Sequence, residues 1–152
     1  MSVEKLHLAM DIAKDAHEGQ TDRGGQPYIL HPYHIMSRFM FDPELASIAV
    51  LHDVVEDSEW TIDAISESGF SVRVCSAIDL LTHEKGQEYL SGYIEGMCGN
   101  YDAVRVKMED IKHNSDVTRL PKIGSSDLKR LKKYHNAFLR LSDAKARHKA
   151  LA

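Results

Sequence analysis

The segment at residues 51–60, LHDVVEDSEW, carries four side chains that bind protons or metal ions: His52, Asp53, Glu56 and Asp57. At about 100° per residue on a helix, these side chains lie within roughly 140° of one another. The apolar residues of the segment fall on the opposite arc. An acidic run is usually the solvated face of an amphipathic helix. A functional site is indicated only if other segments of the chain supply partner side chains.

A second polar group lies in the segment VKMEDIKHN, residues 106–114. On a helix, Lys107, His113 and Asn114 lie within about 60° of Asp110, and the apolar residues point the other way. A carboxylate therefore sits beside an imidazole and an amide on one helix face. Alone, this pattern is typical of a surface ion pair.

Together, three predicted helices offer two imidazoles and two carboxylates: His31, His52, Asp53 and Asp110. This mixed nitrogen and oxygen set suits Mn²⁺, Fe²⁺ or Zn²⁺ and leaves positions open for water or a substrate oxygen. Glu56 and Asp57 follow one turn later, where they would hold or deprotonate that water. A divalent ion lowers the pKa of water from 15.7 towards roughly 7.

The helical period dominates the chain, so the predicted fold class is all-α. The segment GQTDRGGQPYILHP (19–32) is rich in glycine and proline and predicts a structured loop. A first helix is expected to end near His17-Glu18-Gly19, and others from Pro32 through Phe39, from Pro43 through the 51–57 motif, after Thr61, over 71–82, 88–97 and 100–116, and after Asp127.

Length and charge narrow the functional classes. The 152 residues are the size of one domain, and a net charge of −4 argues against a generic nucleic-acid binder. The basic C-terminal region has apolar residues at helical spacing, which favours a packed helix with a solvated basic face. Cys75 and Cys98 form no metal-type pair, and no stretch resembles a signal peptide or a membrane span. We therefore expect a cytoplasmic protein.

Four blocks resemble the HD-domain metal-dependent phosphohydrolases, and within them the hydrolase domain of the Rel/SpoT alarmone enzymes and their small single-domain relatives. The blocks are AHEGQ (16–20), GGQPYILHP (24–32), LHDVVED (51–57) and VKMEDIKHN (106–114). They occur in the family's order and at roughly its spacing.

The resemblance implies an HD-domain helical bundle over residues 1–152, without a synthetase domain. It implies a reaction that removes the 3′-pyrophosphate of ppGpp-like nucleotides with Mn²⁺. Its motifs assign His31, His52, Asp53 and Asp110 as metal ligands, Glu56 and Asp57 as the water-activating pair, and Asn114 and Arg23 as nucleotide contacts. From their positions we add Lys107 and His83 as contacts to the anionic substrate. The expected partner is a small nucleotide, and self-association stays open.

Two departures leave the substrate open. The family typically has two basic residues where this chain has Asp22-Arg23, and Met, Arg and Thr where it has Ser115, Asp116 and Val117. The alternatives are therefore another nucleoside phosphate or phosphodiester as substrate, or a nucleotide-binding sensor without catalysis.

Overall fold

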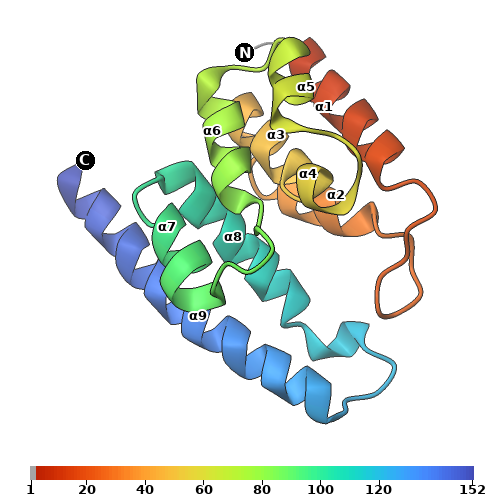
Figure 1. Cartoon of the computed structure of the whole chain (residues 1–152), viewed down its shortest axis with the longest axis vertical. Helices are drawn as coiled ribbons and strands as arrows, with labels where there is room; N and C mark the ends of the chain where they lie inside the picture. Colours follow the sequence, from red (N-terminus) through yellow and green to blue (C-terminus); the bar gives the residue numbers. More distant parts are fainter. Residues whose placement is uncertain (1–2) are drawn as a thin grey trace.

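The apolar helix α3 (Pro43–Leu51) lies at the centre of the fold, in a computed structural model that describes residues 3–152. All its residues from Leu45 to Leu51 are buried. Asp42 begins the helix, because its side chain accepts from the backbone N–H groups of Glu44 and Leu45. Around α3 pack α1 (Val3–Ala16), α2 (Leu30–Ser37), α6 (Val72–Leu81) and α8 (Tyr101–Asn114) (Figure 1).

The remaining elements complete an all-helical fold with no strand among residues 3–152. They are α4 (Val54–Asp57), α5 (Ile62–Glu67), the π-helical turn η1 (Tyr89–Ile94), α7 (Glu95–Met97), the short 3₁₀ turn η2 (Val117–Arg119) and α9 (Ser125–Leu151). The long helix α9 runs beside α8 and η1 (Figure 1). The predicted all-α class is confirmed. No described helix is both long and apolar enough to cross a lipid bilayer.

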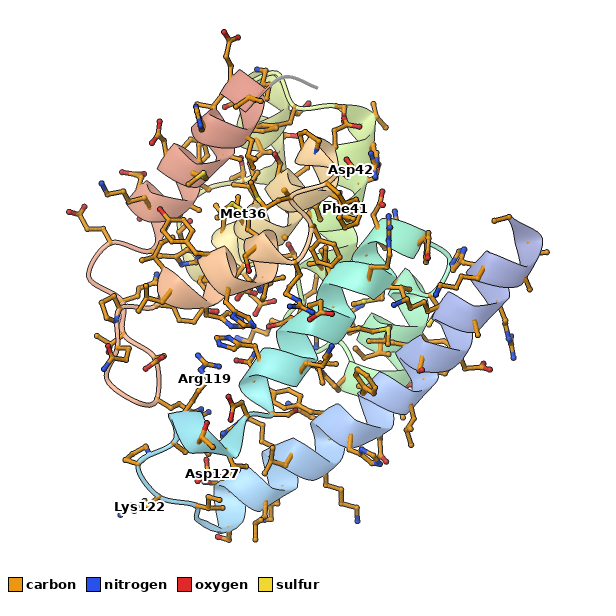
Figure 2. The ribbon with its side chains drawn as sticks, turned by 180° about the vertical axis from the view of Figure 1, so that it is seen from behind. Met36, Phe41, Asp42, Arg119, Lys122 and Asp127 are labelled. Carbon is orange, nitrogen blue, oxygen red and sulfur yellow. The ribbon has the colours of Figure 1, made fainter. Side chains whose placement is uncertain are left out.

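Helix starts follow the capping residues in the sequence. The side chains of Thr61, Ser71 and Asn100 each accept a backbone N–H from the first turn of the helix that follows. In α9, Asp127 accepts from the backbone N–H of Gly124 at 2.9 Å. Asp127 lies where α9 begins, and Arg119 lies on the segment between α8 and α9 (Figure 2).

The expectation of one continuous helix from Pro43 through the 51–57 motif is wrong. The chain leaves the helix between α3 and α4, where Asp53 has φ −106° and ψ 0°. A regular helix would direct neighbouring side chains about 100° apart. The break instead lets His52 and Asp53 face the same cluster of side chains.

Candidate metal centre and active site

Three parts of the fold bring four side chains to one point. His31 comes from the start of α2, His52 and Asp53 from the break between α3 and α4, and Asp110 from α8. One nitrogen or oxygen atom of each lies within 4.8 Å of the corresponding atoms of the other three. The structure thus brings together the four residues that the sequence predicts as metal ligands.

The orientation of His52 suits a cation. Its Nδ1 lies 2.6 Å from the backbone oxygen of Ala49, so Nδ1–H donates there and Nε2 faces the cluster. Nε2 lies 2.9 Å from Asp53 Oδ2 and 3.6 Å from Asp110 Oδ1, and it is buried without a hydrogen-bond partner. Burial lowers the pKa of His52, but the two carboxylates outweigh it and raise the pKa well above its usual value. A positive charge is therefore favoured here, and a divalent ion fits this donor set.

Asp110 is the most heavily bonded member of the cluster. Lys107 Nζ donates to its Oδ2 at 2.7 Å, and Asn114 Nδ2 donates to its Oδ1 at 2.9 Å. His31 Nε2 lies 2.9 Å from the same Oδ1. Burial raises the pKa of Asp110, but Lys107 and the two histidines hold it well below the usual value. Asp110 therefore stays ionised, as a metal ligand must be.

Tyr28 is a site residue that the sequence reasoning missed. Its hydroxyl donates to Asp53 Oδ2, and its ring lies beside His17 and His31. The pKa of Asp53 is lowered to about 2, because His52 and His31 outweigh the opposing effect of burial. The signal was the tyrosine of the motif YILHP, in which only the histidine was assigned a role.

A cavity of about 310 Å³ opens beside the cluster. Glu56 and Asp57 line it, next to Asp53 and Asp110. The carboxylate of Glu56 accepts from the backbone N–H of His83 at 2.6 Å, which sets its direction. We call this space the metal-side cavity.

Glu56 and Asp57 have the protonation behaviour of general bases. Desolvation and the nearby charge of Asp53 raise the pKa of Glu56. The same two causes, with the charge of Glu56, raise the pKa of Asp57 to about 7. A carboxylate with a pKa near the ambient pH is well suited to accept a proton from water.

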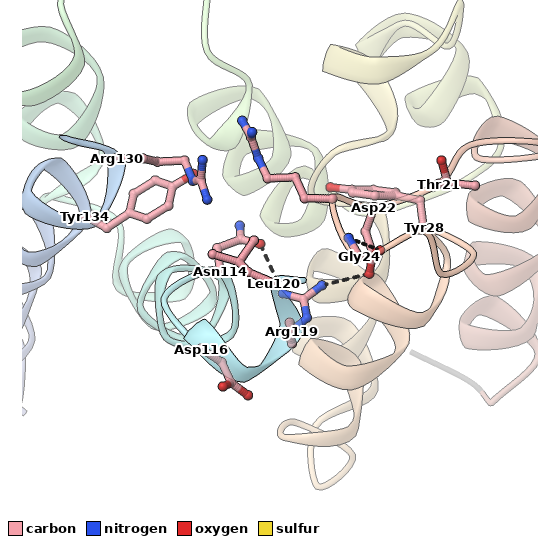
Figure 3. Close-up of a pocket in the computed structure, with 11 residues that line it drawn as sticks. Thr21, Asp22, Gly24, Tyr28, Asn114, Asp116, Arg119, Leu120, Arg130 and Tyr134 are labelled. Atoms are coloured by element: carbon pink, nitrogen blue, oxygen red, sulfur yellow. Dashed lines mark hydrogen bonds and ion pairs between the residues drawn. The ribbon is translucent and has the colours of Figure 1, made fainter. Parts of the chain in front are cut away.

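A second cavity, of about 250 Å³, adjoins the first and shares Tyr28, Asn114 and Tyr134 with it. Figure 3 shows it between the loop that carries Asp22, the segment that carries Arg119, and α9. We call it the outer cavity.

The predicted substrate contacts divide between the two cavities. Lys107, His83 and Asn114 line the metal-side cavity, whereas Arg23 lines the outer cavity. The ring of His83 lies with Nε2 2.8 Å from the backbone oxygen of Gln87, so it braces its own loop.

Helix α9 contributes a basic edge that the sequence reasoning placed in solvent. Arg130 and Tyr134 line the outer cavity (Figure 3). Lys133 and Tyr134 line the metal-side cavity. Burial and the neighbouring cations Lys107, Arg130 and Arg23 lower the pKa of Lys133. The expectation of a wholly solvated basic face is therefore wrong for this part of α9. The spacing i, i+3, i+4 of these three residues was the available signal.

Asp22, which stands where the family typically has a basic residue, has a structural role in the outer cavity. Its Oδ1 accepts from the backbone N–H groups of Gly24 and Gln26, each at 2.9 Å. Its Oδ2 lies 3.4 Å from Arg119 Nη2 (Figure 3). Asp22 therefore closes its own loop and ties it to the segment between α8 and α9.

Known proteins resemble the chain over 68–74% of its length. It is 34% identical over 116 residues to guanosine-3′,5′-bis(diphosphate) 3′-pyrophosphohydrolase of Haemophilus influenzae, covering 68% of this chain and 17% of the relative. It is 33% identical over 124 residues to the bifunctional (p)ppGpp synthase/hydrolase SpoT of Escherichia coli, covering 74% and 18%. The chain spans less than a fifth of the length of these relatives. No protein-family model matches it.

A solved structure has the same fold. It is described as a metazoan orthologue of SpoT that hydrolyzes ppGpp and plays a role in starvation responses. The TM-score is 0.72 over 97% of both chains, at 20% sequence identity. At this identity the likeness establishes the helical architecture.

Proposed function

The chain is a homologue of the hydrolase domain of SpoT- and Rel-type (p)ppGpp hydrolases, and from this premise we propose that it is a metal-dependent 3′-pyrophosphohydrolase of ppGpp-like nucleotides. The observation that carries the proposal is the buried cluster of two histidines and two aspartates beside the pair Glu56 and Asp57. This combination offers a cation site and two proton acceptors in one cavity.

The proposed ligands of the ion are His31, His52, Asp53 and Asp110. The mixed nitrogen and oxygen donors suit a divalent transition ion, and among these we propose Mn²⁺, the ion that the resemblance to the alarmone hydrolases implies. When bound, the ion would supply Lewis acidity and neutralise charge on a phosphoryl group. The buried Nε2 of His52, which faces two carboxylates, supports this assignment.

The protein's own groups would activate water and hold the anion. Glu56 and Asp57 would take the proton of the attacking water, since both carboxylates line the cavity with raised pKa values. Lys107 and Lys133 would face the negative phosphoryl oxygens from two helices. Phosphoryl transfer depends chiefly on such positioning and charge stabilisation.

The outer cavity would hold the nucleoside half of the substrate. Tyr134 offers an aromatic face, and Arg23 and Arg130 offer positive charge to a 5′-phosphate. Asn114 lines both cavities and would contact the nucleotide between them. Asp22 and Asp116 also line the outer cavity, and their negative charge is what favours the second candidate, a different nucleoside phosphate.

The test is product release from metal-stripped protein with and without Mn²⁺. The panel contains ppGpp, pppGpp, their adenosine counterparts, ordinary nucleotides and NADPH. We expect Mn²⁺-dependent pyrophosphate release from ppGpp, and none from the Asp53→Ala variant. Circular dichroism of the variant controls for folding.

Other outcomes separate the alternatives. Turnover of another nucleotide but not ppGpp would overturn the substrate and keep the chemistry. No turnover on the panel, together with tight nucleotide binding, would overturn catalysis in favour of a sensor. Comparison with the Asp22→Arg and Asp116→Arg variants then shows whether these carboxylates set the nucleotide preference.

We also propose that residues 1–152 form a single HD hydrolase domain, which the one continuous hydrophobic cluster among the described residues supports.

Cys75 and Cys98 are free thiols, which supports the reducing, cytoplasmic compartment expected from the sequence. Gel filtration with light scattering tests whether the chain self-associates.

A further inference from the structure

Three histidine rings lie in a row behind the proposed metal site: His31 and His113 meet edge to edge in nearly one plane, and His34 stacks on His113. The rings of His31 and His113 have centroids 5.0 Å apart and planes at 7°, and those of His113 and His34 have centroids 4.0 Å apart and planes at 13°. His31 is buried, whereas His34, at the other end of the row, is exposed. The middle ring therefore lies between a proposed ligand and the surface.

The contact between His31 and His113 restricts where their protons lie. Their Nδ1 atoms are 2.7 Å apart, a hydrogen-bond distance. A neutral imidazole has one N–H and one lone pair, so one Nδ1 must donate and the other accept. To bind a cation, His31 Nε2 must present its lone pair to the cluster, which places the His31 proton on Nδ1. The acceptor is then Nδ1 of His113.

From this geometry we propose that His113 is a positioning residue, which fixes the tautomer and ring orientation of His31 for metal binding through Nε2. Histidine ligands generally donate their second N–H to a carboxylate, a backbone carbonyl or water. His52 follows that rule through Ala49 O. For His31 the corresponding contact is with the side chain of His113, which a substitution can remove. The inference rests on the proposed metal site and is independent of the substrate.

A contact with Arg119 fixes the position of the His113 backbone. Arg119 Nη1 donates to the backbone oxygen of His113 at 2.8 Å and lies 3.4 Å from Asn114 Oδ1. The last turn of α8 therefore carries two residues, each of which contacts a different proposed ligand: His113 contacts His31, and Asn114 contacts Asp110. Arg119 ties this turn to the loop that carries Asp22.

The experiment measures Mn²⁺ affinity of metal-stripped protein by electron paramagnetic resonance of the free ion. His113→Phe keeps a ring but removes the acceptor, so we expect an affinity about 10–100-fold weaker than that of the wild type. His113→Asn keeps an acceptor near the same place and should recover most of the affinity. The matched control is His34→Phe, which changes the ring that stacks on His113 and should leave the affinity unchanged.

The outcomes distinguish this inference from the proposed function. Wild-type protein that binds no Mn²⁺ would overturn the metal site itself. Wild-type binding with equal affinity in His113→Phe would overturn only the positioning role. Nitrogen-15 NMR of the Zn²⁺-loaded wild type tests the tautomer without any variant: we expect the proton on Nδ1 of His31 and on Nε2 of His113. The proton of His31 on Nε2 would contradict the inference.

Discussion

Lys107 Nζ donates to Asp110 Oδ2 at 2.7 Å, and both side chains are almost completely buried on α8. Burial raises the pKa of Asp110, but the charge of Lys107 and the contacts with His31 and His52 outweigh it and hold the pKa well below its usual value. The lysine predicted to meet the substrate therefore also compensates the charge of a proposed metal ligand. Because Lys107 contacts a proposed metal ligand, we expect metal binding and the free energy of unfolding to be coupled.

Replacement of Lys107 by methionine should destabilise the metal-free protein. A buried carboxylate would lose its ammonium partner, at a cost of about 3 kcal/mol in the free energy of unfolding. Saturating Mn²⁺ should recover part of this loss, because the ion compensates Asp110. Urea unfolding in EDTA and in Mn²⁺ measures both values.

The control for this prediction is Lys112→Met, which removes a lysine that contacts Glu109 at 3.2 Å on the exposed part of the same helix. Its effect should stay below about 1 kcal/mol. Equal losses for Lys107→Met with and without Mn²⁺ would contradict the link to the metal.

Glu56→Gln should lower kcat by about 10²–10⁴-fold, because an amide cannot accept the proton of water. Mn²⁺ affinity should stay close to that of the wild type, since Glu56 is not among the four clustered side chains. Steady-state kinetics measures kcat, and metal titration measures the Mn²⁺ affinity. Glu59→Gln, on the exposed segment nearby, serves as the control and should leave kcat unchanged. Full activity of Glu56→Gln would remove Glu56 from the mechanism.

Gly24→Ala should impair substrate binding but not metal binding. A Cβ at Gly24 would lie 2.6 Å from the backbone oxygen of Arg119, so the loop and the segment after α8 must move apart. Overpacking of this kind costs about 1–3 kcal/mol. We expect a raised KM with unchanged Mn²⁺ affinity. Gly96→Ala, which meets nothing within 4 Å, is the control. An unchanged KM would show that the outer cavity does not bind substrate.

An ion-pair cluster between α3, α6 and α8 predicts acid sensitivity. Arg73 donates to Asp42, Glu44 and Asp102 at 2.7–3.1 Å, and the pKa of each of the three carboxyls is lowered. For Asp42 and Glu44 the largest cause is a side-chain hydrogen bond, from Arg73 and Ser71 respectively. For Asp102, burial opposes the lowering, but Arg73 and Arg105 outweigh it. These contacts hold together helices that position the site.

Carboxyls with lowered folded-state pKa values stabilise the protein above their unfolded pKa, about 4, and lose this contribution as the pH falls through the folded value. Arg73→Met should therefore cost roughly 1–2 kcal/mol at pH 7, allowing for partial solvent screening. The difference from the wild type should shrink below about pH 4. Chemical unfolding between pH 3 and pH 7 measures it. A difference that is independent of pH would mean that packing, not charge, is lost.

Local signals in the sequence were sufficient for most helices. Asp42-Pro43, Thr61, Ser71 and Asn100 each begin a helix close to the start that the sequence predicts. Capping depends on a few neighbouring residues, so it can be read from the chain alone. The break at Asp53 could not be predicted in this way, because it serves contacts with α2 and α8 that lie far away in sequence.

The sequence by itself determined the helical class and the types of side chain available for the site, since periodicity and residue chemistry are local properties. It also singled out His31, His52, Asp53 and Asp110, which do converge, although their role as ligands stays a prediction. Only the tertiary structure decided how these groups are supported. Tyr28 reaches Asp53 across 25 positions, and His113 reaches His31 across 82. Such hydrogen bonds depend on distances and orientations between helices, which are set by packing of the whole core.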